Sequence, residues 1–201
     1  MKELVVATRN RGKLEEIRAV LAGVVETVRC SADFFDFPDT VEDGATFAEN
    51  ALKKAREAML FTGFPALADD SGLAVDVLKG APGVYSARYA GEGADDASNN
   101  RKLLAEMTEV PLERRRAAFV CAMAFVTPDG SEGMFTGSIG GCILPEERGK
   151  GGFGYDPLFL VDGLGRTMAE LTLEEKNKIS HRGQALRQFR EYLEQRQQNL
   201  K

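Results

Sequence analysis

Ten consecutive apolar residues, AAFVCAMAFV at positions 117–126, set the fold class of this 201-residue chain. Apolar side chains on both alternating faces are typical of a central strand that is covered on both sides. The turn sequence Pro128-Asp129-Gly130 follows, and a second strand is predicted to return through residues 132–144. The two strands predict a long hairpin, so the sheet is expected to be mixed rather than purely parallel.

Helical patterns flank this hairpin in the sequence. Thr46-x-x-Glu49 is a capping box, and apolar residues follow it at helical spacing until Gly63. Another helix is predicted after Ser180, with a buried face made of Leu186, Phe189 and Leu193. We therefore expect an α/β (mixed α+β) fold with a central mixed sheet and flanking helices, in a single domain that covers residues 1–201.

Composition and charge exclude several classes of protein. The net charge of -5, from 31 acidic and 26 basic residues, argues against nucleic-acid or membrane partners, which need clustered positive charge. The apolar runs fall short of the roughly 18 residues of a spanning helix, and the first ten residues are unlike a signal peptide. The single histidine, His181, excludes a multi-histidine metal site. Cys30, Cys121 and Cys142 form no CxxC pair and predict core residues of a cytoplasmic protein.

A polar loop follows the first apolar run. It consists of Thr8, Arg9, Asn10, Arg11, Gly12 and Lys13, and a helical pattern begins directly after it. The loop lacks the upstream glycine and the following Ser/Thr of a P-loop. Backbone N–H groups at a helix N-terminus beside a lysine still suit an anion. The alternative is a solvated turn with a helix cap.

Two adjacent carboxylates give the best metal candidate. The apolar run 65–68 is predicted to be a short strand, with Asp69 and Asp70 at its end. Paired carboxylates are costly to desolvate unless they bind a cation, and oxygen ligands suit Mg²⁺. Glu42 and Asp43, just before the predicted helix at residue 46, are candidates to complete the site. The alternative interpretation is a turn capped by an aspartate.

The glycine-rich run 149–154 matches G-x-G-x-x-G in letters only. A dinucleotide fold needs a strand before this motif and a helix after it, and Tyr155-Asp156-Pro157 follows here. We reject that fold. The run is either an ordinary flexible connection or a loop whose backbone approaches a ligand closely.

A cluster of donors precedes the last helix. Lys176, His181 and Arg182 lie within seven residues and are able to donate hydrogen bonds to a phosphate or to a base carbonyl. The alternative is a polar start to a helix. Nucleophilic chemistry with His181 as the base is disfavoured because the chain has no G-x-S-x-G elbow.

Taken in order, these segments resemble a known family. The motifs are Thr8-x-Asn10-x-Gly12-Lys13-x-x-Glu16, Thr46-Phe47-x-Glu49-Asn50-Ala51, Ala68-Asp69-Asp70-Ser71-Gly72-Leu73, Gly80-Ala81-Pro82-Gly83-x-Tyr85-Ser86-Ala87-Arg88, Gly151-Gly152-Phe153-Gly154-Tyr155-Asp156-Pro157 and Ser180-His181-Arg182-Gly183. The chain closely resembles the inosine triphosphate pyrophosphatase family, also known as dITP/XTP pyrophosphatases or HAM1-like proteins. The resemblance implies two lobes with the active-site cleft between them, and a homodimer.

The resemblance also implies an activity and roles for individual residues. The implied reaction is Mg²⁺-dependent hydrolysis of ITP, dITP and XTP to the monophosphate and pyrophosphate, which cleanses the nucleotide pool and prevents incorporation into DNA and RNA. Asp70 matches the proton acceptor and a metal ligand, and Glu42 a second metal ligand. Substrate-binding positions fall on Thr8, Arg9, Asn10, Arg11, Gly12, Lys13, Ser71, Phe153, Gly154, Tyr155, Asp156, Lys176, His181 and Arg182.

Three other functions compete with this one. A different nucleotide hydrolase, such as a pyrimidine-directed enzyme or a generic Mg²⁺ phosphatase, would share the carboxylates and Lys13 but not the pair His181-Arg182. A non-catalytic nucleotide-binding module would have less need of the intact pair Asp69-Asp70. A purely structural domain would leave the polar motifs unexplained.

Overall fold

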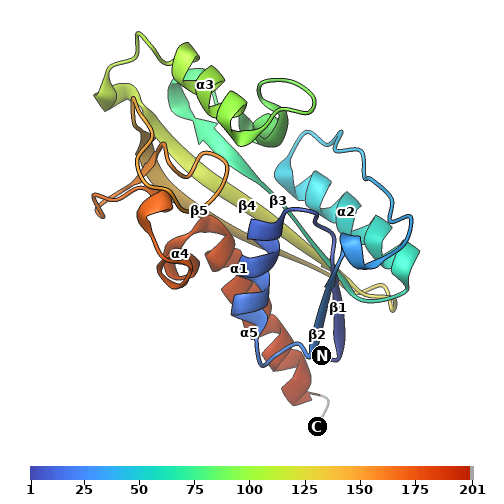
Figure 1. The fold of residues 1–201 in the computed structure, drawn as a ribbon. Coiled ribbons are helices and arrows are strands. Elements are labelled where there is room, and N and C mark those ends of the chain that lie inside the picture. Colours follow the sequence, from blue (N-terminus) through green and yellow to red (C-terminus); the bar gives the residue numbers. More distant parts are fainter. Residues whose placement is uncertain (200–201) are drawn as a thin grey trace. The chain divides into compact units, whose positions relative to one another are not determined.

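The computed structural model describes residues 1–199. Its strands form a six-stranded sheet in the order β2-β1-β3-β4-β5-β6, and helices flank it (Figure 1). The helices and strands are β1 (Glu3–Val6), α1 (Arg11–Leu21), β2 (Thr27–Cys30), α2 (Phe47–Thr62), β3 (Ala66–Val75), α3 (Asp96–Glu106), β4 (Arg116–Val126), β5 (Glu132–Ile143), β6 (Phe159–Val161), α4 (Leu173–Ile179) and α5 (His181–Asn199).

The predicted mixed sheet is confirmed. β1 pairs in parallel with β2 and with β3, whereas β5 pairs antiparallel with β6. The predicted hairpin corresponds to β4 and β5, and its turn is closed where Gly130 N donates to Thr127 O at 2.9 Å and Thr127 N donates to Ser131 O at 3.0 Å. The capping box at Thr46 and Glu49 is present at the start of α2. The helix predicted after Ser180 is also present, as α5.

The prediction for the strand before Asp69 is wrong in one respect. β3 continues to Val75, so Asp69 and Asp70 lie inside the strand rather than at its end. The continuation is possible because both carboxylates have buried partners. Beyond them, Leu73 N donates to Ser86 Oγ at 2.9 Å, and Gly72 leaves room for Ser86, because a Cβ at residue 72 would collide with it.

The chain divides into two compact units. Unit 1 comprises residues 1–70, 121–137 and 182–201, and its last segment is described as far as residue 199. Unit 2 comprises residues 71–120 and 138–181. Three strands, β3, β4 and β5, contribute residues to both units.

The core of unit 1 confirms that β4 is covered on both faces there. Cys121, Met123 and Phe125 pack with α1 and α5, through residues that include Ile17, Leu21, Leu186 and Phe189. Ala124 and Val126 point to the other face and pack with Ala51 and Ala55 of α2. This alternation is the one expected of a central strand.

The core of unit 2 is a separate cluster. It gathers Leu73 and Val75 of β3, Leu103 of α3, Ile143 of β5 and Phe159 of β6. Among residues 1–199, no helix is long and apolar enough to cross a bilayer. The cysteines are free: Cys30 and Cys121 are buried, and Cys142 is half-buried.

A buried arginine of unit 2 donates hydrogen bonds to three backbone carbonyl groups in two segments of the chain. The Arg115 side chain is 6% exposed. Its Nε donates to Val110 O at 2.9 Å, its Nη2 to Met107 O at 2.7 Å and its Nη1 to Leu144 O at 3.4 Å. The guanidinium therefore supplies donors to carbonyl groups that follow α3 and β5.

We expect Arg115→Met to lower the free energy of unfolding by about 3 kcal/mol or more, because it removes three hydrogen bonds donated by a buried charged group, each of which contributes roughly 1.5–3 kcal/mol. The neighbouring Arg114 is exposed, and Arg114→Met is expected to change stability by no more than about 0.5 kcal/mol. Urea denaturation followed by circular dichroism measures both. Equal effects of the two substitutions would contradict the role given to Arg115.

Candidate functional site

The buried Asp69 carboxylate of unit 1 is paired with two cations. Its side chain is 1% exposed, and its Oδ2 lies 3.0 Å from Lys13 Nζ and 3.1 Å from Arg182 Nε. Burial raises the pKa of Asp69, but the charges of Lys13 and Arg182 outweigh burial and hold that pKa below the ordinary value of 3.8. Asp69 therefore remains ionised and positions two cations.

Arg182 is deeply buried at the start of α5. Its Nη1 lies 2.6 Å from Glu16 Oε2, and its Nε binds Asp69. Lys13 and Glu16 are three residues apart on α1 and therefore share one face of that helix. The side chains of α1, β3 and α5 thus meet in one ion-pair cluster, and these contacts give Arg182 a positioning role.

The neighbouring Asp70 has different partners. Its Oδ2 accepts a hydrogen bond from Asn50 Nδ2 at 3.0 Å, and its Oδ1 lies 3.3 Å from Lys54 Nζ. Adjacent residues of a strand point to opposite faces of the sheet, in agreement with the different partners of Asp69 and Asp70. Burial raises the pKa of Asp70 above 3.8, against the opposing effects of Lys54 and Asn50. The two adjacent carboxylates therefore differ in their partners and in the direction of their pKa shifts.

Lys54 joins Asp70 to the second predicted metal ligand. Its Nζ lies 2.8 Å from Glu42 Oε1 as well as 3.3 Å from Asp70 Oδ1. Burial lowers the pKa of Lys54, but the charges of Asp70, Asp69 and Glu42 outweigh burial and raise it above 10.5. The ammonium group is therefore charged, and both carboxylates converge on one cation.

The convergence of the Glu42 and Asp70 carboxylates bears on whether a metal ion is able to bind here. Within residues 1–199, no group of three or more His, Cys, Asp or Glu side chains is arranged to hold a metal ion. Mg²⁺ nevertheless requires only one or two protein carboxylates when phosphate oxygens and waters supply the rest. Glu42 and Asp70 meet that requirement, since their oxygens already converge on the Lys54 ammonium. Asp43 is exposed and instead pairs with Lys53 at 2.7 Å.

The polar loop before α1 forms a helix cap. Asn10 is the N-cap residue, and its Oδ1 accepts a hydrogen bond from Lys13 N at 3.0 Å. Asn10 N in turn donates to Thr8 Oγ1 at 3.2 Å. The side chain of Arg9 points to a different partner, the exposed Asp39, at 2.9 Å. Arg11 is exposed, and Gly12 is half-buried in the first turn of α1.

The predicted residues of unit 2 form a second polar cluster. Asp156 Oδ2 accepts hydrogen bonds from Phe153 N at 2.9 Å and from Lys176 Nζ at 2.6 Å, and both charged side chains are nearly buried. Lys176 Nζ lies 4.4 Å from the centre of the Phe153 ring. Asp156 therefore fixes both the backbone at Phe153 and the ammonium group beside its ring.

The two aromatic candidates differ in exposure. Tyr155 is 5% exposed within the core of unit 2, and its hydroxyl donates to Ser86 O at 2.8 Å. Phe153 is half-buried. Phe153 is therefore the better candidate of the two to contact a ligand ring. Ser71 lies in β3 directly after Asp70 and is half-buried.

His181 is placed by an aromatic contact. Its ring stacks on that of Phe119, with 4.9 Å between ring centres and an angle of 14° between the planes. The side chain is buried at the start of α5. Its orientation is thus set by β4, because Phe119 belongs to that strand.

No site role was predicted from the sequence for Asn50, Lys54 or Glu16, although the family motifs contain Asn50 and Glu16. Asn50 and Lys54 are four residues apart on α2, on the same buried face as Ala51, Ala55 and Ala58. A polar residue at an apolar-face position of an otherwise amphipathic helix is the signal that identifies them.

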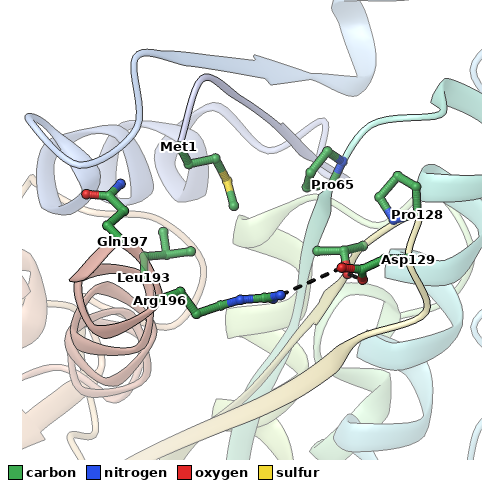
Figure 2. A pocket seen from close by; sticks show the side chains of 8 residues that line it. Met1, Pro65, Pro128, Asp129, Leu193, Arg196 and Gln197 are labelled. Atoms are coloured by element: carbon green, nitrogen blue, oxygen red, sulfur yellow. Dashed lines mark hydrogen bonds and ion pairs between the residues drawn. The ribbon is translucent and has the colours of Figure 1, made fainter. Parts of the chain in front are cut away.

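A cavity of about 410 Å³ in unit 1 lies elsewhere (Figure 2). It is lined by Met1, Pro65, Thr127, Pro128, Asp129, Leu193, Arg196 and Gln197, none of which is a predicted site residue. Arg196 Nη2 lies 3.7 Å from Asp129 Oδ2 in this cavity.

Comparisons with known proteins agree with the predicted family. The family model described as the Ham1 family matches residues 4–192. A dITP/XTP pyrophosphatase of Geobacter sulfurreducens is 58% identical over 193 residues, which cover 96% of this chain and 97% of the relative. One from Desulforamulus reducens is 52% identical over 95% of both chains. The structure of a HAM1 protein from Coxiella burnetii is similar with a TM-score of 0.87 and 44% identity, and the match covers 97% of this chain and 100% of that one. The chain therefore belongs to the Ham1 family.

Proposed function

We propose that this protein hydrolyses noncanonical purine nucleoside triphosphates (ITP, dITP and XTP) to the nucleoside monophosphate and pyrophosphate, with Mg²⁺ as its cofactor. The observation that carries this proposal is the buried Asp70 carboxylate, which shares the Lys54 ammonium with Glu42 and is held by Asn50. The names of relatives that match nearly the whole chain support the substrate class.

In this proposal Asp70 accepts the proton of the attacking water. The water oxygen forms a bond to the α-phosphorus, the bond from that phosphorus to the bridging oxygen breaks, and pyrophosphate leaves with the electron pair. Phosphoryl transfer depends mainly on positioning and charge neutralisation. Glu42 and Asp70 would hold the Mg²⁺ ion, which supplies positive charge to the phosphate oxygens when bound.

The remaining substrate contacts follow from the predicted residues. Thr8, Asn10, Gly12 and Lys13 would bind phosphates, because they surround the N-terminus of α1, where backbone N–H groups favour anions. Arg9, Arg11, Ser71, Gly154, Tyr155, Asp156 and Lys176 remain proposed substrate-binding positions. Asp69 and Arg182 would keep Lys13 in place.

Base selection is assigned to Phe153 and to the pair His181-Arg182. Hypoxanthine and xanthine carry a carbonyl at C6, where adenine carries an amino group. A hydrogen-bond donor of the protein at this position pairs with the C6 carbonyl of hypoxanthine or xanthine. It is left unpaired opposite the amino group of adenine. Sites of this kind discriminate by up to about 10⁴–10⁵. Phe153 would pack on the base.

We further propose a homodimer that acts in the cytoplasm and removes these nucleotides before their incorporation into DNA and RNA. The free cysteines are consistent with a reducing compartment. The net charge of -5 agrees with a small-molecule substrate rather than a nucleic acid.

The first prediction from the proposed function concerns the products. With Mg²⁺, we expect pyrophosphate from ITP and XTP, little from GTP or ATP, and none in EDTA. Separate assays for pyrophosphate and orthophosphate measure the two possible cleavage sites. Orthophosphate instead of pyrophosphate would mean attack at the terminal phosphate, as in a generic phosphatase. Binding without turnover would leave a nucleotide-binding module.

The second prediction separates the two aspartates. Asp70→Asn is expected to abolish turnover while stability changes by no more than about 1 kcal/mol, because the amide removes a buried charge that folding disfavours. Asp69→Asn is the matched variant. It leaves Lys13 and Arg182 short of a counter-charge and should lower the free energy of unfolding by about 3 kcal/mol or more.

Steady-state turnover of ITP, calorimetric binding of ITP and thermal unfolding are to be measured on both variants. Near-normal turnover by Asp70→Asn would remove Asp70 from the mechanism. An unchanged melting temperature in Asp69→Asn would contradict its positioning role.

The third prediction concerns base recognition. Arg182 is unsuitable for this test, because its substitution leaves the buried carboxylates of Asp69 and Glu16 without this cation. The expected loss in the free energy of unfolding is about 3–5 kcal/mol. His181→Phe keeps an aromatic ring against Phe119 but removes the ring N–H donors. We expect a lower kcat/KM for ITP and a narrower margin over ATP. If the ratio between the two substrates is unchanged, His181 takes no part in base selection.

A further inference from the structure

Two side chains of α3 form hydrogen bonds with the backbone N–H and carbonyl of Gly154. Asp96 Oδ2 accepts a hydrogen bond from Gly154 N at 2.7 Å, and Asn100 Nδ2 donates to Gly154 O at 3.2 Å. Asp96 and Asn100 are four residues apart on α3 and therefore lie one above the other on the same face. The N–H and the carbonyl of a single glycine are thus bound by two successive turns of α3.

Asn100 occupies a position that packing alone would give to an apolar residue. It is 3% exposed, and Leu103, Leu104 and Met107 follow it at helical spacing in the core of unit 2. Its Nδ2 donates to Glu147 Oε1 at 2.9 Å as well as to Gly154 O. Its Oδ1 is buried without a hydrogen-bond partner among residues 1–199. A buried unpaired oxygen destabilises the fold, so the contribution of Asn100 lies in the two bonds that its amide donates.

The loop held in this way carries Phe153. On its other side, Phe153 N donates to Asp156 Oδ2 at 2.9 Å. Gly152 adopts a φ of 73°, and a Cβ there would collide with Asp156. The backbone around Phe153 is therefore bound on both sides, by Asp156 from within the loop and by α3 through Gly154. The direction of the Phe153 ring depends on both attachments.

We infer that Asp96 and Asn100 are positioning residues, which hold the Phe153 loop in the conformation that binds the purine base. The inference rests on the proposed function, in which Phe153 packs on the base. Neither residue touches the reacting phosphate in that mechanism. Loss of either one should therefore weaken substrate binding and leave the chemical step intact.

The test compares two neighbouring aspartates. Asp95 is the N-cap of α3, and its Oδ1 accepts a hydrogen bond from Ser98 N at 2.7 Å. Asp95→Ala therefore weakens the helix without removing a bond to Gly154, whereas Asp96→Ala removes that bond. Asp96→Asn keeps an oxygen that can accept from Gly154 N and should restore most of the function. Asn100→Ala removes the second attachment.

For Asp96→Ala and Asn100→Ala, we expect KM for ITP to rise by up to about tenfold with kcat within about twofold, since an intramolecular hydrogen bond contributes roughly 0.5–1.5 kcal/mol, which is up to a factor of about ten. Hydrogen–deuterium exchange of the peptide covering residues 149–156 should become faster in the same variants. Asp95→Ala and Asp96→Asn should stay near the unmodified protein in both measurements.

Two outcomes would overturn the inference. Faster exchange with an unchanged KM would mean that α3 holds the loop but that base binding does not depend on it. An equal rise in KM for Asp95→Ala would assign the effect to the stability of α3. If the unmodified protein releases no pyrophosphate from ITP, the proposed function fails, and the calorimetric Kd for ITP then replaces KM in the same comparison.

Discussion

The ion pair of Asp69 with Lys13 and Arg182 is the interaction on which the rest of unit 1 depends. It places a charged group in the middle of β3 and connects it to side chains from α1 and α5. A buried charge is tolerated only when it is paired and hydrogen-bonded, and removing one partner is far more harmful than exchanging the whole cluster for apolar residues. The cluster therefore constrains where α1 and α5 pack against β3 more than it adds to stability.

The strand geometry gives two neighbouring carboxylates opposite roles. Asp69 faces Lys13 and Arg182, which lower its pKa, while Asp70 faces Asn50 and Lys54 in surroundings where burial raises its pKa. In a surface turn at this position, both carboxylates would be exposed to water. A continuous strand separates them, because successive side chains alternate between faces. The chemistry assigned to Asp70 thus depends on a regular backbone rather than on a strained loop.

Local signals in the sequence were sufficient for much of the fold. The run 117–126 predicted a strand covered on both faces, and Thr46 with Glu49 predicted the start of a helix, because these signals act over a few residues. The position of Asp69 within β3 was not predictable in this way. Its partner Arg182 is 113 residues away in the chain, and without that partner two adjacent aspartates indicate a strand end.

Lys54, Asn50 and β2 were not predicted because each depends on partners outside its own segment of the chain. Lys54 and Asn50 belong to a helix whose start was correctly predicted. Their polar side chains at apolar-face positions are a local signal, but the carboxylates that pair with Lys54 are distant in the chain and have no such signal. The short strand β2 (Thr27–Cys30) owes its existence to parallel pairing with β1 rather than to its own four residues. By contrast, the family motifs contain Lys13, Asp69 and Arg182, which are distant in the sequence and form one ion-pair cluster in the structure.

The division into two units has a consequence for how such a protein is inherited. Unit 1 is assembled from three separate stretches of the chain and unit 2 from two. Neither unit corresponds to one uninterrupted piece of a gene, so a single recombination event cannot exchange, duplicate or delete either of them whole.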